Sequence, residues 1–341
     1  MLARLLQMAS SVTEVAYVVS ETAGTITSID LSNPESLSEL DSHTSANLTN
    51  TYDVAIDTEN RVAYVVALGA DSITSIDISD PGNLSELDSY TSVNIDTATA
   101  IAIDTVNSVA YVVSQDPDSI TSIDISNPSS LSELDSFTSA NLNQPEGISL
   151  DIANSVAYVA AYISNAITAI DISNPSAMTE LDSYTSANLN YAADVAVDTA
   201  NSVAYVASLS SDSITAIDIS TPSSMSELDS HTSANLNGAN RIAIDTVNSV
   251  AYVLSSAANS ITSIDISTPT SLAELDSHTS ANISDPYGIA LDVPNAIAYV
   301  TSFTADKIVA IDISTPSSMS ELDDYTSTNL DKARGIAIDT A

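Results

Sequence analysis

A 47-residue repeat runs through almost the whole chain and restricts its possible folds more than any other feature. The repeat carries an Ala-Tyr dipeptide whose tyrosine returns without insertion or deletion, at Tyr17, Tyr64, Tyr111, Tyr158, Tyr205, Tyr252 and Tyr299. The same register holds an aspartate, from Asp30 to Asp312, and a proline four residues later. Seven units fill residues 13–341 and leave residues 1–12 as an N-terminal extension. Repeats of this length indicate a solenoid, a propeller or an array.

Each unit contains four short segments with strand character. In the second unit they are residues 54–57, 62–66, 73–78 and 84–90. The first three are rich in Val, Ile and Tyr, and the fourth alternates polar with apolar residues as a half-exposed strand does. No segment has a helical period. Four strands in one repeat of this size predict a propeller blade.

The two ends of the chain favour a closed ring. The chain begins inside a unit, at the second-strand segment Val15–Val19, and ends with the first-strand segment Ile336–Asp339. Pairing these segments would remove two open sheet edges, whereas a solenoid would leave both ends uncapped. The predicted fold is therefore all-β: a seven-bladed propeller of four-stranded blades, closed by pairing of the C-terminal strand with the N-terminal blade.

Two repeat families share motifs with these units. The segment Ile120–Ser136, with its Ile-Asp-Ile-Ser-Asn-Pro core, resembles the LVIVD propeller repeat. The recurring Asn-Ser-Val-Ala-Tyr-Val is similar to the YVTN family of surface-layer propellers. The resemblance extends over all seven units and implies a propeller found at cell surfaces or in secreted proteins.

Charge restricts the possible partners. The chain has 45 acidic and 6 basic residues, a formal net charge of −39. Nucleic acid is excluded because phosphate binding requires a basic surface. No apolar run approaches the roughly 18 residues of a membrane span. The acidity and the scarcity of lysine suggest a halophilic source. The alternative explanation is that one acidic unit was copied seven times, since four repeated positions account for 28 of the 45 acidic residues.

Most polar residues of the repeat have a structural interpretation. The Asp57 and Asp77 series stand at turns, where carboxylates cap backbone N–H groups. The Glu86 and Asp88 series alternate on the outermost strand and are expected to face solvent and block edge-to-edge association. Three histidines share one position with Tyr and Phe, which predicts aromatic packing and no metal site: His43, His231 and His278. No cofactor is predicted.

Differences between the units are concentrated in two loops, one before the first strand and one between the second and third strands. In an up-and-down blade both loops emerge on one face, and binding residues usually lie on such loops. Aromatic and basic residues in or beside these loops are the candidate ligand-binding residues: Tyr52, Tyr162, Tyr191, Arg241, Tyr287, Phe303, Lys307, Lys332 and Arg334. Neutral drift of an unconstrained surface would give the same divergence.

The absence of a catalytic motif favours a non-enzymatic function. The chain has no Gly-x-Ser-x-Gly, no phosphate-binding glycine loop and no His-Glu-x-x-His, and its strand positions look nearly identical from blade to blade. The sequence therefore predicts an extracellular or cell-surface module that binds a glycan or protein partner or assembles with itself. One alternative is a structural subunit of a filament or surface layer, with residues 1–12 making contacts. Another is a hydrolase resembling lactonase-type propellers, which would require a metal or polar cluster at the channel mouth.

Overall fold

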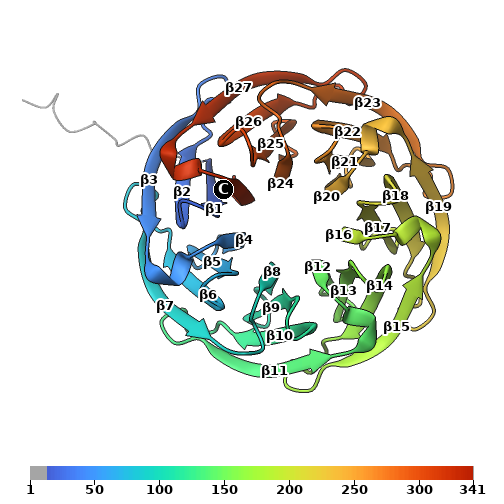
Figure 1. Ribbon diagram of the computed structural model, residues 1–341, viewed down its shortest axis with the longest axis horizontal. Coiled ribbons are helices and arrows are strands. Elements are labelled where there is room, and N and C mark those ends of the chain that lie inside the picture. Colours follow the sequence, from blue (N-terminus) through green and yellow to red (C-terminus); the bar gives the residue numbers. More distant parts are fainter. Residues whose placement is uncertain (1–13, 341) are drawn as a thin grey trace, which may run out of the picture.

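Seven antiparallel four-stranded sheets are arranged as blades around a central axis (Figure 1). This computed structural model describes residues 14–340, so the predicted extension of residues 1–12 lies outside the described part. The all-β seven-bladed propeller expected from the repeat is confirmed. Among residues 14–340 no helix is long and apolar enough to cross a membrane.

Each blade contributes one strand to each of four concentric layers. The inner strands, nearest the axis, are β4 Thr51–Asp57, β8 Ala98–Asp104, β12 Pro145–Asp151, β16 Ala192–Asp198, β20 Ala239–Asp245, β24 Pro286–Asp292 and β28 Ala333–Asp339. The second strands are β1 Val15–Ser20, β5 Val62–Ala67, β9 Val109–Ser114, β13 Val156–Ala161, β17 Val203–Ser208, β21 Val250–Ser255 and β25 Ile297–Ser302.

The outer half of each blade follows in sequence order. The third strands are β2 Thr25–Asp30, β6 Ser72–Asp77, β10 Ser119–Asp124, β14 Ala166–Asp171, β18 Ser213–Asp218, β22 Ser260–Asp265 and β26 Lys307–Asp312. The outer strands are β3 Ser38–Thr44, β7 Ser85–Thr91, β11 Ser132–Thr138, β15 Thr179–Thr185, β19 Ser226–Thr232, β23 Ala273–Thr279 and β27 Ser320–Thr326. Short 3₁₀ helices follow five of the outer strands: η1 Ala46–Leu48, η2 Ala140–Leu142, η3 Ala187–Leu189, η4 Ala234–Leu236 and η5 Thr328–Leu330.

The ring closes through the two ends of the chain, as predicted. Strand β28 pairs antiparallel with β1, with Val15 opposite Asp339 and Val18 opposite Ile336. The closing blade therefore combines the last strand of the chain with its first three, in the order β28-β1-β2-β3. This pairing leaves neither terminal strand as an open edge of its sheet.

The core lies between the blades. The repeated tyrosine of each second strand is fully buried and packs against the neighbouring sheet; Tyr205 of β17, for example, shares a cluster with Ile242 of β20 and Val253 of β21. Because each blade buries one face against the next, the apolar second and third strands form a continuous ring of contacts.

The repeated carboxylates confirm one prediction and contradict another. Asp77 accepts a hydrogen bond from the N–H of Ser79 at 2.9 Å and Asp57 from that of Asn60 at 2.9 Å, so both series cap turns as expected. The expectation that Glu86 and Asp88 face solvent is wrong. The glutamate series accepts a hydrogen bond from an asparagine of the preceding blade, at Glu39, Glu86, Glu133, Glu180, Glu227, Glu274 and Glu321.

The Asp88 series also joins neighbouring blades. Each of its seven aspartates accepts a hydrogen bond from a backbone N–H of the following blade; Asp88, for example, bonds the N–H of Leu131 at 2.7 Å. The prediction failed because it treated the outermost strand as an isolated edge, whereas the preceding blade supplies a donor to Glu86 and the following blade a donor to Asp88.

Candidate functional site

A β-bulge at the start of each inner strand shapes the mouth of the central channel. In β4, Thr51 pairs with Ala67 and Asp53 with Val66, so Tyr52 is an extra residue, and the same shift occurs in the other six inner strands. Consecutive residues of a regular strand point to opposite faces, and a bulge changes that direction. Tyr52 and Asp53 consequently line the same cavity.

The residues at these two positions differ from blade to blade. The first position holds Tyr52, Thr99, Glu146, Ala193, Asn240, Tyr287 and Arg334. The second holds Asp53, Ala100, Gly147, Asp194, Arg241, Gly288 and Gly335. The sequence placed both positions in the divergent loop before the first strand. The structure places them instead within the inner strands at the channel mouth, so strand positions are not nearly identical there.

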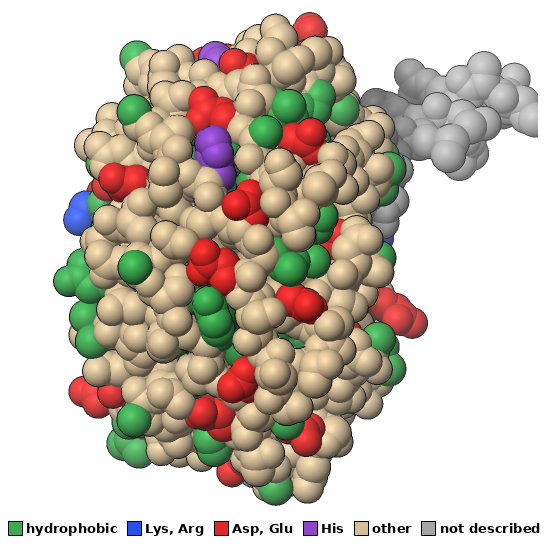
Figure 2. Space-filling model, turned by 90° about the vertical axis from the view of Figure 1, so that its right-hand side faces the viewer, with side chains coloured by type: hydrophobic (Ala, Val, Ile, Leu, Met, Phe, Trp, Pro, Cys, Tyr) green, Lys and Arg blue, Asp and Glu red, His purple; other side chains and the backbone are tan. Residues whose placement is uncertain are grey.

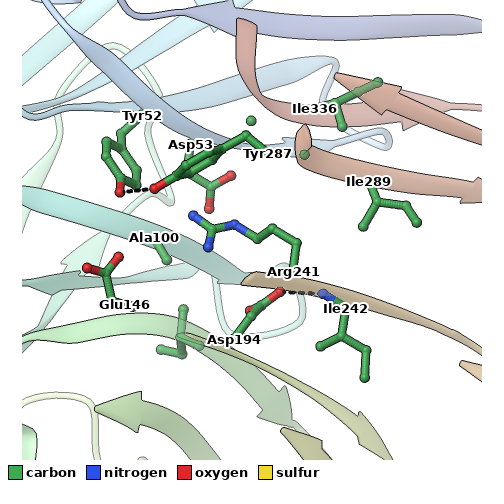
Figure 3. Close-up of a pocket in the computed structure, with 13 residues that line it drawn as sticks. Tyr52, Asp53, Ala100, Glu146, Asp194, Arg241, Ile242, Tyr287, Ile289 and Ile336 are labelled. Atoms are coloured by element: carbon green, nitrogen blue, oxygen red, sulfur yellow. Dashed lines mark hydrogen bonds between the residues drawn. The ribbon is translucent and has the colours of Figure 1, made fainter. Parts of the chain in front are cut away.

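These side chains enclose a cavity of about 120 Å³ on the propeller axis (Figure 3). Arg241 extends across it from β20, with Asp53 and Tyr287 on one side and Asp194 on the other, and Glu146 near the end of its side chain. The cavity thus brings together three carboxyl groups, one guanidinium group and two phenols from five different blades.

The guanidinium group of Arg241 is fixed in position while most of its donors remain unbonded within the described part of the chain. Its Cζ lies 4.5 Å from the ring centroid of Tyr287, and Nη1 donates a hydrogen bond to the carbonyl of Asn240 at 2.7 Å. Within residues 14–340 this is the one hydrogen bond of its side chain, although a guanidinium has five N–H donors. The remaining N–H donors of Arg241 face the cavity. Within residues 14–340 the Arg241 guanidinium forms no close ion pair with a carboxyl group, although the cavity contains three.

Asp194 is the carboxyl group best suited to exchange a proton near neutral pH. Burial raises its pKa from 3.8 to about 6, against the lowering effect of Arg241 and of two backbone N–H groups. Those N–H groups belong to Val195, which bonds Oδ1 at 2.9 Å, and Ile242, which bonds Oδ2 at 3.0 Å. Each oxygen keeps a second lone pair for a ligand.

Asp53 repeats this arrangement on the opposite wall. Its oxygens accept hydrogen bonds from the N–H groups of Val54 at 2.9 Å and Ile101 at 3.1 Å, and burial raises its pKa. Glycines on the preceding blades make room for both aspartates. A Cβ at Gly147 would lie 2.5 Å from Oδ1 of Asp194, and one at Gly335 would lie 2.7 Å from Oδ1 of Asp53.

Glu146 completes the carboxyl set. Burial raises its pKa, which Arg241 and the hydrogen bond donated by Gln115 partly offset. The phenol of Tyr52 is also buried, which raises its pKa well above 10, and its hydroxyl lies 2.5 Å from that of Tyr287. The phenol of Tyr52 therefore remains protonated at neutral pH.

A second arginine forms a closed cage beside the cavity. The Cζ of Arg334 lies 4.2 Å from the ring centroids of Tyr52 and Tyr287 and 4.8 Å from that of Phe303. Its Nε donates to Glu21 at 2.6 Å. Lys332 lies 5.4 Å from the Phe303 centroid and 3.5 Å from a carboxylate oxygen of Glu21. These contacts join β28 to blades on both sides of the closure.

The structure brings most of the predicted ligand-binding residues together at one mouth. Tyr52, Arg241 and Tyr287 line the cavity, and Phe303, Lys332 and Arg334 form the adjoining cage. Tyr162 and Tyr191 stack on each other near Glu146. Lys307 is placed apart, because its Nζ bonds Asn282 at 2.7 Å and Asp324 at 2.5 Å in the outer part of its blade.

The sequence interpretation missed the three cavity carboxyl groups. Asp53, Glu146 and Asp194 lie within the divergent windows, but aromatic and basic residues alone were selected there. A signal was present: the position of Glu146 is acidic in one unit and that of Asp53 and Asp194 in two, whereas each framework position that supplies the 28 repeated acidic residues is acidic in all seven. Among residues 14–340 no group of three or more His, Cys, Asp or Glu has the arrangement of a metal site.

Residues 84–341 match the family described as "Lactonase, 7-bladed beta-propeller", and residues 62–92 match the LVIVD repeat. The chain belongs to the lactonase family of seven-bladed β-propellers. Membership of this family contradicts the prediction of a non-catalytic binding module and the prediction that the chain is not an enzyme. That prediction was wrong because it relied on the many repeated positions, which carry no catalytic motif, whereas the cavity is formed by the few positions that differ between units.

Solved structures share the fold of this family member at low sequence identity. A candidate 6-phosphogluconolactonase from Bacteroides uniformis aligns with a TM-score of 0.81 at 10% identity, over 96% of this chain and 99% of its own. The periplasmic gluconolactonase of Pseudomonas aeruginosa aligns with a TM-score of 0.78 at 12% identity, over 95% and 98%. None of the curated proteins compared with the chain matches it.

Proposed function

We propose that this lactonase-family protein hydrolyses the ring ester of a sugar-acid lactone at the mouth of its central channel. The observation that carries the proposal is the cavity itself, where a guanidinium with free donors faces a carboxyl group whose pKa is about 6. Such a pair supplies the two things that ester hydrolysis requires: a base for water and a donor for the developing oxyanion.

The proposed reaction assigns one role to each group. Asp194, as carboxylate, accepts a proton from water while the water oxygen bonds to the lactone carbonyl carbon. The N–H groups of Arg241 stabilise the negative charge that develops on the carbonyl oxygen. The intermediate then expels the ring oxygen, which takes the proton from Asp194, and the product is the open-chain hydroxy acid.

The other cavity residues orient the substrate. The hydroxyls of Tyr52 and Tyr287 and the carboxyl groups of Asp53 and Glu146 offer donors and acceptors to the hydroxyls of a polyhydroxylated ring. The names of the neighbours from Bacteroides uniformis and Pseudomonas aeruginosa support a sugar lactone as substrate.

The test is hydrolysis of D-glucono-1,5-lactone, followed as acid release at pH 6.5 and corrected for spontaneous opening. Arg241→Lys should lower kcat/KM at least 100-fold, since loss of one oxyanion donor typically costs about 10²–10³. Arg61→Lys is the matched control, because Arg61 bonds Asp339 at the far end of the inner strands. Wild-type protein that does not accelerate lactone opening, or equal rates for the two variants, would refute the proposal.

We also propose that the protein works outside the cytoplasm. The periplasmic location of the Pseudomonas aeruginosa neighbour and the resemblance to surface-layer propellers support this location. Fractionation of the source cells tests it, since recovery of the protein in the cytosolic fraction would contradict export.

A further inference from the structure

The small size of the cavity limits how much of a substrate it can enclose. Its volume of about 120 Å³ is well below the roughly 300–1,000 Å³ of pockets that enclose drug-sized ligands. If lactone hydrolysis is the function, the cavity holds the reacting ring and little else. Any group attached to that ring must lie on the rim of the channel mouth.

One side of the rim is already filled by its own contacts. The guanidinium of Arg334 covers the rings of Tyr52, Tyr287 and Phe303 at 4.2–4.8 Å, and Glu21 binds that guanidinium. The aromatic faces there are occupied by a cation, so this side offers little surface to a second ring.

The other side carries an aromatic pair with no such cover. Tyr162, from the loop after β13, and Tyr191, just before β16, stack with ring centroids 4.1 Å apart and planes inclined by 9°. Both side chains are half-buried, and within residues 14–340 no cation lies over either ring. The N–H of Tyr162 donates a hydrogen bond to the carbonyl of Gln144 at 2.8 Å, two residues before the cavity residue Glu146, and Tyr191 stands three residues before the cavity residue Asp194, so the pair lies beside the cavity.

Tyr191 occupies a position whose backbone is left-handed in every blade. Its φ is +58°, a left-handed conformation, and the equivalent residues of the other six blades are also left-handed, including Asn50 at +55° and Gly238 at +75°. Asn and Gly adopt this conformation at least cost, but Thr97, Gln144 and Lys332 also adopt it, so this position accepts side chains of several sizes, and what distinguishes Tyr191 is its stacking on Tyr162.

We propose that the stacked pair Tyr162–Tyr191 is a sugar platform that receives a neutral glycosyl group attached to the lactone ring. The substrates preferred by the site would then be lactones of disaccharide acids. A tyrosine face is apolar with a polar tip, and it suits the C–H face and the hydroxyl edge of a pyranose. A neutral sugar is favoured over an anionic group because two carboxyl groups make this part of the rim acidic: Glu146, and Asp118, which accepts a hydrogen bond from the N–H of Gln144.

The test compares cellobiono-1,5-lactone with glucono-1,5-lactone in the full-length protein. Wild type should hydrolyse the disaccharide lactone with a kcat/KM at least tenfold higher. Tyr191→Asn and Tyr162→Ala should reduce this ratio to within about twofold of unity. Asn50 already occupies the position of Tyr191 in another blade with φ +55°, so Tyr191→Asn should fold. Tyr90→Asn, on the outer strand β7, is the control and should keep the wild-type ratio.

The outcomes separate the platform from the proposed function. Hydrolysis of both lactones with a ratio near unity in wild type would overturn the platform and leave lactone hydrolysis standing. Failure to hydrolyse either lactone would overturn the proposed function. In that case calorimetric binding of cellobionate decides the platform: binding that Tyr191→Asn weakens at least tenfold supports it, and absent or unchanged binding overturns it.

Discussion

At the scale of single residues, the cavity is made by departures from the repeat. Arg241 and Asp194 occupy the same position in neighbouring units, and Gly147 occupies it in the unit before. The sequence could show that these positions diverge, and it could show which residues they carry. It could not show that a bulge turns two consecutive residues toward the axis, because the bulge depends on pairing between strands.

Asp194 gives the proposed reaction a defined pH dependence. A general base acts as carboxylate, so activity rises as pH increases through its pKa of about 6. We expect kcat/KM for gluconolactone to rise about tenfold per pH unit below pH 6 and to level off above it. Asp194→Asn should lower kcat/KM by about 10²–10⁴ at pH 7, the usual contribution of a general base.

Initial rates between pH 5 and 7.5, corrected for spontaneous opening, measure this profile. Arg241, Asp53 and the N–H groups of Val195 and Ile242 all act on the Asp194 carboxyl group, so Arg241→Lys should also shift the midpoint. A flat profile across this range, or unchanged activity in Asp194→Asn, would assign the base to another residue.

Gly147 is predicted to be essential for the position of Asp194. A Cβ at residue 147 would approach Cα of Asp194 to 2.7 Å as well as its Oδ1, so one of the two inner strands must move. Overpacking of this kind typically costs about 1–3 kcal/mol. Gly147→Ala should therefore lower both the free energy of unfolding and kcat/KM.

Gly82→Ala is the control for that substitution. A Cβ at Gly82 would meet Asp80 Oδ1 at 3.5 Å, an ordinary contact on an exposed turn, so stability should stay within about ±0.5 kcal/mol. Chemical denaturation of the two variants measures the difference. Equal stabilities and equal rates would show that the inner strands adapt without cost.

At the scale of strands and blades, the repeated polar residues hold neighbours together. Glu86 of β7 accepts hydrogen bonds from Ser45 Oγ at 2.6 Å and Asn47 Nδ2 at 2.7 Å, both from the preceding blade. The strand pattern in the sequence predicted the four strands and the turns capped by aspartates. It could not reveal this bond because the partner residues lie about 40 positions away, and only the ring geometry brings them together.

Removing one such bond tests its contribution. Glu86→Ala should lower the free energy of unfolding by about 1–3 kcal/mol, since hydrogen bonds to a charged group contribute about 1.5–3 kcal/mol and this site is partly exposed. Glu59→Ala, at an exposed turn, should change stability by less than about 0.5 kcal/mol. Denaturation midpoints that coincide for the two variants would show that the solvent satisfies Ser45 and Asn47 equally well.

At the scale of the whole molecule, ring closure was the most predictable feature and charge balance the least. The incomplete units at both ends foretold that β28 would pair with β1. The net charge of −39 does not predict where the carboxylates lie. Figure 2 shows them scattered over the outer wall. Fourteen carboxylates, those of the Glu86 and Asp88 series, accept hydrogen bonds from neutral donors of an adjacent blade. Since the chain has six basic residues, most of its 45 acidic residues lack a cationic partner.

This imbalance predicts that salt stabilises the protein. Within residues 14–340, four Lys and Arg side chains make ion pairs with three carboxylates: Asp339, Asp324 and Glu21, the last of which is shared by two cations. Repulsion among the remaining carboxylates acts over the Debye length, which falls from about 10 Å at 0.1 M to about 3 Å at 1 M salt. The melting temperature at pH 7.5 should therefore rise between 0.05 and 1 M KCl, steeply at first and then more slowly as screening saturates.

Choline chloride at equal ionic strength is the control, since screening does not depend on which monovalent cation is present. A rise with KCl alone would indicate specific cation binding. A melting temperature that is independent of both salts would contradict the prediction: the blade-to-blade hydrogen bonds would then offset the repulsion, and the acidity would be a result of repeat copying.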